Sequence, residues 1–163
     1  MLININNMKY PVEFKNITAK TEFYTELLKA HEEAVSYLKG FPWCKSIIDS
    51  HLYLNLGSTL CIFLFEIDNT ASRDDNYLWV IVGDLPPMYL DTHGPRTTKH
   101  VLEDYVKLAE DWITHVKQGK SVQNCYPFKA KPTLEMATLL ERRASFIKDT
   151  LIDNTEDVKI SVR

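Results

Sequence analysis

Three short apolar segments follow one another in the middle of the chain, and they constrain the fold more than any other feature. Residues 51–56 alternate between polar and apolar side chains, which is typical of a strand with one buried face. Gly57-Ser58 comes next, and a two-residue loop with glycine first suits a tight hairpin. The runs 59–67 and 77–82 are apolar enough for two further strands. Strands joined by such short connections predict an antiparallel meander.

Helical periodicity surrounds this central part of the chain. Apolar side chains recur at spacings of three and four over residues 18–39, 97–118 and 133–151, which predicts three amphipathic helices. Gly40 and Gly119 follow the first two of these stretches, and glycine can adopt the left-handed conformation that closes a helix. The order of the segments therefore predicts an α+β fold.

Shorter stretches suit additions to the sheet. Residues 3–5 and 12–14 suggest one or two short extended segments, and Pro11 confines any strand there to an edge. Residues 88–91 suit a further short strand after the double proline. The tail, residues 158–162, alternates cleanly, and either an edge strand or a loose end fits that pattern.

These observations predict one α+β domain over residues 1–163, with an antiparallel meander of three to five strands packed against about three amphipathic helices. A chain of 163 residues suits a single hydrophobic core. We expect that core to lie between the sheet and the helices. Its expected members are Leu54, Leu56, Phe63, Phe65, Val80, Val82, Leu108 and Trp112.

The charge balance disfavours several kinds of partner. The 19 basic and 22 acidic side chains give a formal charge of −3, which offers little attraction to nucleic-acid phosphates or anionic lipids. The longest apolar run, residues 60–65, is far shorter than the about 20 residues that a membrane-spanning helix needs. The first residues lack the basic and long apolar parts of a secretory signal. We expect a cytoplasmic protein that binds neither nucleic acid nor membrane.

Cysteines and glycines give no sign of a cofactor. Cys44, Cys61 and Cys125 lie far apart, and none forms the CxxC pair that zinc or redox sites use, so a reducing compartment fits best. The five glycines form neither GxGxxG nor GxxxxGK[ST], the patterns of phosphate-binding loops. Residues 91–103 contain aspartate, histidine and glutamate but no dense metal-binding motif. We therefore expect no metal and no cofactor.

The densest group of unusual side chains surrounds the double proline Pro86-Pro87. Carboxylates and aromatic hydroxyls on a rigid corner beside a sheet suit a cationic or hydrogen-bonding partner. For Asp84 the alternative is a structural role, since an aspartate in a turn commonly accepts hydrogen bonds from nearby backbone amides. His31 lies on the apolar face of the first predicted helix, where we expect a neutral, hydrogen-bonded core histidine. The candidate binding residues at the corner are Trp79, Asp84, Tyr89, Asp91 and His93.

The same corner carries a resemblance to known sequences. Residues 77–90, followed by a long amphipathic helix, resemble a group of uncharacterised bacterial domains that share the pattern W-x-V-x-G-D-L-P-x-x-Y. Trp79 and Tyr89 bound the matching segment, and Ile81 stands at the valine position. By order of elements the resemblance extends over residues 50–118. It implies a small bacterial α+β domain, and it implies no assigned activity.

Two functions fit the sequence. The first is a non-catalytic protein-interaction or regulatory domain that neutralises or regulates another protein, as immunity proteins do. The absence of a catalytic motif such as GxSxG and the aromatic residues near the proline corner favour it. The second is a small-molecule-binding protein or enzyme with a pocket between the corner and the second helix, near Asp84, Tyr89 and His93. Either function is compatible with a homodimer, and the position of the deepest cavity separates the two.

Overall fold

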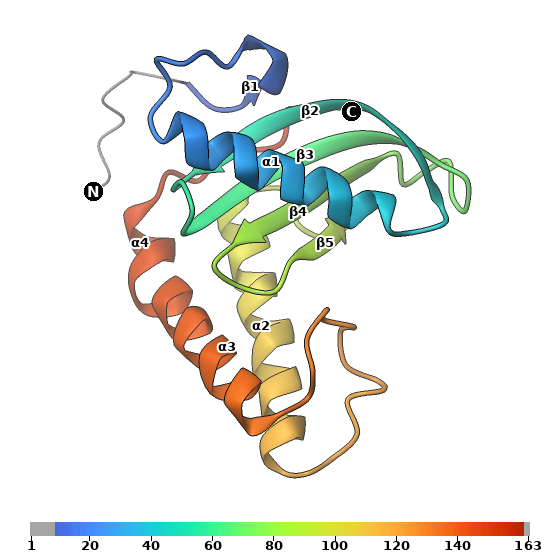
Figure 1. Ribbon diagram of the computed structural model, residues 1–163, viewed down its shortest axis with the longest axis vertical. Helices are drawn as coiled ribbons and strands as arrows, with labels where there is room; N and C mark the ends of the chain where they lie inside the picture. The colour runs from blue at the N-terminus through green and yellow to red at the C-terminus, as the bar shows by residue number, and fades with distance from the viewer. Residues whose placement is uncertain (1–8, 162–163) are drawn as a thin grey trace.

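A computed structural model describes residues 9–161 of the chain. Its sheet is a five-stranded antiparallel meander, in which each strand pairs with the next one along the sequence (Figure 1). The predicted α+β fold with an antiparallel sheet is confirmed. The strands are β1 (Val12–Glu13), β2 (Cys44–Asn55), β3 (Leu60–Asn69), β4 (Tyr77–Gly83) and β5 (Met88–Asp91).

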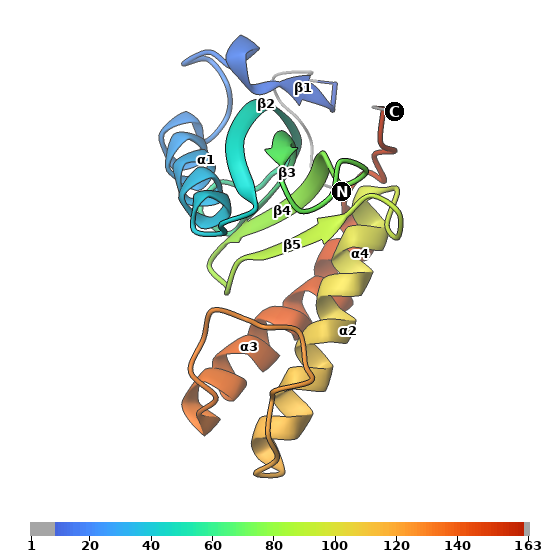
Figure 2. The same cartoon turned by 90° about the vertical axis from the view of Figure 1, so that its right-hand side faces the viewer.

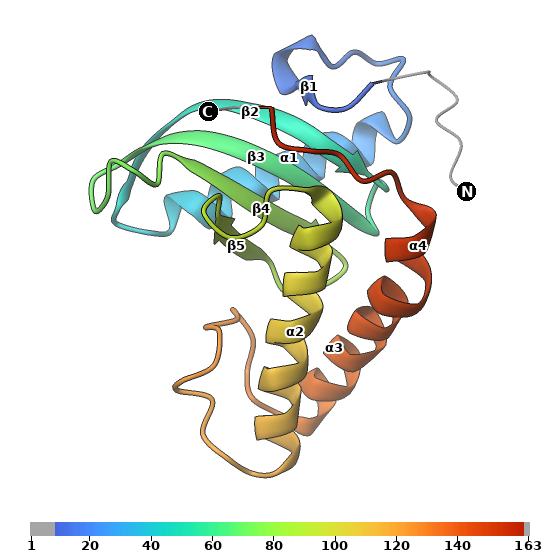
Figure 3. The same cartoon turned by 180° about the vertical axis from the view of Figure 1, so that it is seen from behind.

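Helices cover both faces of the sheet. α1 (Tyr24–Lys39) lies on the face that Figure 1 turns to the viewer, and α2 (Thr98–Lys117) lies on the face seen in Figure 3. α3 (Leu134–Phe146) packs beside α2 and continues through a π-helical turn, η2 (Ile147–Leu151), into the short α4 (Ile152–Asn154). Figure 2 shows the resulting layers, with α1 on one side of the strands and the α2 and α3 pair on the other.

The start of α1 differs from the predicted start near residue 18. A short 3-10 turn, η1 (Phe14–Asn16), and an irregular stretch come first, and Phe23 adopts a left-handed φ of 56° directly before Tyr24. Phe23 packs against the β2–β3 turn, where a Cβ atom placed on Gly57 would lie 2.9 Å from the Phe23 ring. Gly57 itself has a φ of 61°, so both the backbone and the space require glycine. The predicted tight hairpin at Gly57 is confirmed, and the N–H of Leu56 donates to the carbonyl of Leu60 at 2.9 Å.

β2 departs from the alternation that its sequence predicts. Its register against β3 shifts between Leu52 and Leu54, which is the mark of a β-bulge. As a result Leu52 packs on the α1 side, whereas both Tyr53 and Leu54 pack on the α2 side. Tyr53 is fully buried and Leu54 is only half-buried, which is the reverse of the expected pattern.

The sheet separates two hydrophobic cores, so the prediction of a single core is wrong. Side chains 60–65 of β3 are all buried, and they point alternately toward α1 and toward the α2 and α3 pair. A strand that is apolar on both faces needs a cover on each face, and one cover cannot serve both. The predicted core set therefore divides by face. Phe63, Phe65, Val80 and Val82 pack with α1, whereas Leu54, Leu56, Leu108 and Trp112 belong to the α2 side.

Gly119 closes α2 with the expected left-handed φ of 68°, whereas Gly40 after α1 has a right-handed φ of −69°, so that expectation is wrong for Gly40. The Thr97 hydroxyl accepts the N–H of His100 at the start of α2, and the Thr133 hydroxyl accepts the N–H of Met136 at the start of α3. The tail forms no strand in the described part of the chain, although Lys159 makes a single antiparallel bridge with Thr97. The predicted extended segment at residues 3–5 lies outside the described residues. No helix within residues 9–161 has both the length and the apolar character that crossing a bilayer would require.

His31 is part of the α1-side core, as its place on the helix predicts. Its ring stacks on Phe14 with the centroids 3.6 Å apart, and its Nε2 forms a 2.8 Å hydrogen bond with the Ser50 hydroxyl. Burial lowers the pKa of His31 to about 4, so the imidazole is neutral at physiological pH. The predicted neutral, hydrogen-bonded core histidine is therefore confirmed.

The His31 pKa makes stability depend on pH in a defined window. The ring of the unfolded chain gains a proton near pH 6.5, whereas the ring of the folded chain gains it only near pH 4. Stability is therefore fully present above pH 6.5 and is lost as pH falls toward 4. After allowance for partial solvent screening, we expect a loss of about 1 to 2 kcal/mol. Urea unfolding between pH 7 and 4 measures it, and a His31→Gln variant with an unchanged pH slope would contradict the assignment.

Trp112 tests the α2-side core. Its side chain is 1% exposed, so the Trp112→Ala substitution leaves a cavity and should lower the free energy of unfolding by about 3 to 5 kcal/mol. Ile48→Ala is the matched control, because Ile48 lies in β2 but is 60% exposed. Urea titration of both variants measures the difference. A loss below about 1 kcal/mol for Trp112→Ala would place this residue outside the core.

Candidate functional site

Trp79 lies in the α2-side core with an exposed fraction of 0%. Its indole N–H donates to the carbonyl of Pro95 at 2.9 Å, and its ring meets Tyr53 edge-on at 4.8 Å between centroids. These contacts hold the connection between β5 and α2 against the sheet. Trp79 offers no surface to a partner in this conformation, so the structure sets it apart from the other predicted site residues.

Asp84 holds the corner in a different way from the predicted one. Its backbone N–H donates to the carbonyl of Thr59 at 3.1 Å, and this bond fixes the turn. Its carboxylate does not bind local amides but forms a 2.7 Å ion pair with Arg143 of α3. The Arg143 Nε also donates to the Asp84 carbonyl at 2.7 Å. With 66% of the Asp84 side chain exposed, the pair is a surface link between the sheet and α3.

Asp91 and His93 form a turn at the opposite end of β4. The Asp91 carboxylate accepts the N–H of His93 at 2.9 Å and that of Gly94 at 3.3 Å. His93 Nε2 lies 3.2 Å from the Asp75 carboxylate, in the connection between β3 and β4. Because Asp91 pairs with Leu78 at the start of β4 and Asp84 follows its end, the predicted group does not converge on one place.

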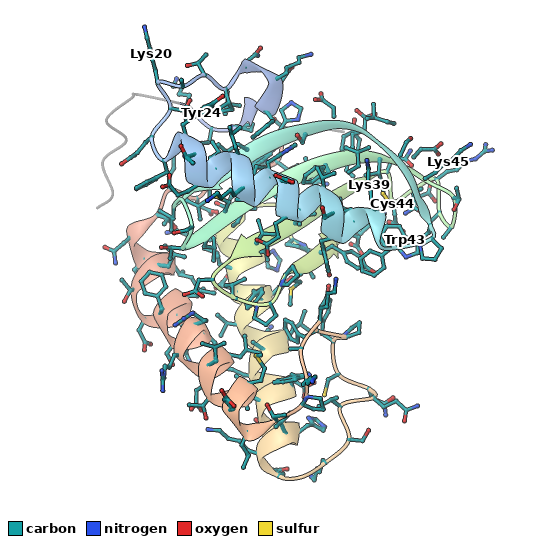
Figure 4. The ribbon with its side chains drawn as sticks, viewed as in Figure 1. Lys20, Tyr24, Lys39, Trp43, Cys44 and Lys45 are labelled. Carbon is teal, nitrogen blue, oxygen red and sulfur yellow. The ribbon has the colours of Figure 1, made fainter. Side chains whose placement is uncertain are left out.

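Tyr89 is half-buried at the centre of five partly exposed aromatic rings, which we call the aromatic surface. Its ring centroid lies 5.1 Å from that of Phe41 and 5.2 Å from that of Trp43. Figure 4 shows Trp43 where α1 leads into β2, close to Lys39 and Lys45. The members are Tyr37, Phe41, Trp43, Tyr89 and Tyr126.

Tyr126 links the aromatic surface to the edge of the sheet. Its hydroxyl accepts the N–H of Tyr89 and donates to the carbonyl of Tyr89, both at 3.0 Å. Burial raises the pKa of Tyr126, so the phenol keeps the proton that it donates. The loop after α2 therefore covers the outer edge of β5, and Tyr126 and Phe128 anchor this loop to the core.

A large cavity lies elsewhere, beside the β2–β3 turn, and we call it the hairpin cavity. Its volume is about 630 Å³, within the range of small-molecule sites. Three parts of the chain meet there: the stretch before α1, the β2–β3 hairpin and the segment from the end of α3 to the tail. The lining residues are Tyr10, Glu22, Phe23, Tyr53, Leu54, Asn55, Leu56, Thr59, Phe146, Thr150, Leu151, Asn154, Thr155, Glu156 and Val158.

Each of the three walls of this cavity contains a backbone irregularity. Phe23 has its left-handed φ, which is uncommon for a residue with a side chain. The bulge in β2 directs both Tyr53 and Leu54 to this side of the sheet. The π-helical turn Ile147–Leu151 supplies Thr150 and Leu151. Such irregularities concentrate at functional sites, and no pattern in the sequence marks any of them.

Charges around the hairpin cavity have one sign. Glu22 and Glu156 line it, whereas no lysine, arginine or histidine of the described residues does. Burial raises the pKa of Tyr10 to about 12, with further contributions from Cys61 and the two glutamates. Burial likewise raises the pKa of Cys61 to about 12. Both groups therefore keep their protons at neutral pH and act neither as a base nor as a nucleophile.

Smaller hollows adjoin the hairpin cavity at Thr59. One of about 260 Å³ is bounded by Asp84, Arg143 and Phe146, and another of about 440 Å³ reaches Asp84 from the side of α1. Tyr89 and His93 line neither the hairpin cavity nor these smaller hollows. Of the predicted corner residues, Asp84 alone therefore borders this region.

Comparisons with known proteins give no relative: no family model, no curated protein and no solved structure matches the chain. The residues themselves must carry any functional argument.

Removal of the Asp84 carboxylate tests whether this group stabilises the turn after β4 or only the ion pair with Arg143. Asp84→Ala leaves the backbone bond to Thr59 in place and removes an exposed ion pair, so the free energy of unfolding should fall by less than about 1 kcal/mol. Arg143→Ala also removes the bond to the Asp84 carbonyl and should cost more. Urea unfolding ranks the two variants. The reverse order would show that the Asp84 carboxylate has a buried structural partner.

Proposed function

We propose that this protein is a non-catalytic binding domain whose hairpin cavity takes a small organic molecule with an apolar body and a positively charged group. The proposal rests on the lining of the 630 Å³ cavity, which consists of aromatic and aliphatic side chains, polar groups and two carboxylates. Among the described residues, no basic side chain lines it.

The apolar part of the lining supplies a surface for the body of such a ligand. Phe23 and Phe146 are 44% and 40% exposed, although large apolar side chains are usually buried. Leu54 and Leu56 also line the cavity, and both are half-buried. A ligand that covers these side chains removes apolar area from water, at about 25 cal/mol for each Å².

The charged part of the lining favours a ligand with a positive charge. Glu22 is half-buried, so its charge is less screened by solvent than that of an ordinary surface carboxylate. Glu156 adds a second negative charge, and both glutamates add to the rise that burial causes in the pKa of Tyr10, which lines the same cavity. An anionic ligand would be repelled there, and a protonated amine or a quaternary ammonium group would be attracted.

The aromatic surface favours a second candidate function, the protein-interaction domain that the sequence suggests. Tyrosine and tryptophan are enriched among the residues that dominate binding energy at protein interfaces. Trp43 and Tyr89 are half-buried on a contiguous face, and their contacts leave part of each ring accessible. A partner protein would cover this face, which lies outside the hairpin cavity, so the two functions are compatible in one cytoplasmic bacterial domain.

A pair of probes with the same ring and opposite charge tests the cavity. By isothermal titration calorimetry, naphthylethylamine should bind with a dissociation constant below about 1 mM, and naphthylacetate at least about tenfold more weakly. Thr150→Trp should abolish binding because Thr150 is exposed and lines the cavity. Thr138→Trp is the matched control, since Thr138 is exposed on the preceding helical segment and lies outside the lining.

Reversing the charge of a lining glutamate then tests whether the cavity prefers a positively charged ligand. Glu156→Lys should weaken the amine and strengthen the carboxylate, whereas Glu32→Lys, on the exposed face of α1, should change neither. Equal affinity of the two probes for the parent protein, no binding of either, or unchanged binding in Thr150→Trp would each contradict the proposed function.

A further inference from the structure

At the far end of α2, three side chains of different chemistry converge. Asp111 and His115 are one turn apart on this helix, with Asp111 Oδ1 and His115 Nδ1 separated by 3.5 Å. Cys125 comes from the loop that follows and is buried. One ligand atom from each of the three lies within 4.8 Å of the other two. Figure 3 shows this end of α2 away from the sheet, so the group is separate from the hairpin cavity.

We propose that Asp111, His115 and Cys125 form a binding site for a zinc ion. A thiolate, an imidazole and a carboxylate are the ligand types that zinc prefers, whereas calcium and magnesium require oxygen ligands. Zinc lies about 2.0 to 2.3 Å from such atoms, so the ligand atoms of a tetrahedral site lie about 3.3 to 3.7 Å from one another. The three atoms here lie within 4.8 Å of one another, so a contraction of about 1 Å brings them to that spacing.

The contraction needs movement of side chains only, because the loop after α2 already holds Cys125 in place. The N–H of Cys125 donates to the carbonyl of Val122 at 3.0 Å, and the neighbouring residues Tyr126 and Phe128 anchor the loop to the core. Cys125 is 8% exposed and fixed, whereas the Asp111 side chain is 52% exposed and free to rotate toward the ion. The same exposure leaves the fourth position of a tetrahedral site open to water.

Charge explains how the group accepts a divalent cation. The group offers one carboxylate, one thiol and one imidazole to the ion. Zinc binding releases the thiol proton to solvent, and the ion then balances one carboxylate and one thiolate with the neutral imidazole. His115 Nδ1, which now lies 2.8 Å from the Asp111 carbonyl, carries no proton when it binds the ion. The negative end of the α2 dipole also favours a cation there.

A second three-residue group lacks this chemistry. Glu13 lies on the edge strand β1, and Asp49 and His51 lie on the neighbouring strand β2, with ligand atoms within the same 4.8 Å of one another. The Glu13 carboxylate there is already paired with Lys15 at 3.0 Å, and the group contains no thiol. The sequence does not reveal the group at the end of α2, because Cys125 has no fixed spacing to the Asp111 and His115 pair.

Titration of the metal-free full chain with zinc and cobalt tests the site. With a chromophoric competitor, we expect one equivalent of zinc to bind with a dissociation constant below about 1 μM. Cobalt should give the thiolate-to-metal charge-transfer absorption and the visible bands of a tetrahedral site. Cys125→Ser should remove the charge-transfer absorption, and His115→Gln should weaken zinc binding at least about tenfold.

Matched controls separate the site from general metal affinity. His100 and Asp104 form a similar pair on the same helix, but within the described residues no cysteine joins them in a three-residue group. His100→Gln breaks this pair and should leave zinc binding unchanged. Cys44→Ser removes another buried thiol and should keep the cobalt spectrum. Circular dichroism of each metal-free variant verifies folding, and Asp111→Asn replaces Cys125→Ser if that variant unfolds. Cobalt binding without a thiolate band, or zinc binding that survives both ligand substitutions, would overturn the proposal.

Discussion

The burial of β3 on both faces is the constraint on which the rest of the structure depends. Every side chain from residue 60 to residue 65 is buried, so neither face of the central strand can meet water. α1 must therefore cover one face and the α2 and α3 pair the other. The connections follow from this requirement, because the chain has to cross from the α1 side before the sheet to the α2 side after it.

The sheet also has edges, and the chain protects the outer one with side chains. β5 is four residues long, and the hydroxyl of Tyr126 binds both free backbone groups of Tyr89 on its open side. This arrangement saturates polar groups that could otherwise pair with a strand of another molecule. The same contact fixes the loop that carries Cys125, so edge protection and the end of α2 are physically linked.

Patterns in the sequence predicted the elements well, since periodicity reports which side of a segment is apolar. The hairpin at Gly57 and the caps at Thr97 and Thr133 depend on local chemistry and were predictable for that reason. Two features were not predictable. The bulge in β2 inserts a residue without changing composition, and the division into two cores depends on which helix covers which face.

The candidate site was even less predictable from sequence patterns than the fold. Sequence reasoning grouped Asp84, Tyr89 and His93 because they are close along the chain, but β4 and β5 carry them to different places. The hairpin cavity instead combines Phe23, Leu54 and Thr150, which come from three distant segments. The left-handed φ of Phe23, the bulge in β2 and the π-helical turn bring these residues together. Each of these irregularities costs conformational energy, and the packing of the two cores on the faces of β3 offsets that cost. A cavity walled by such departures is therefore a property of the whole fold, and it can persist only while both faces of the central strand stay covered.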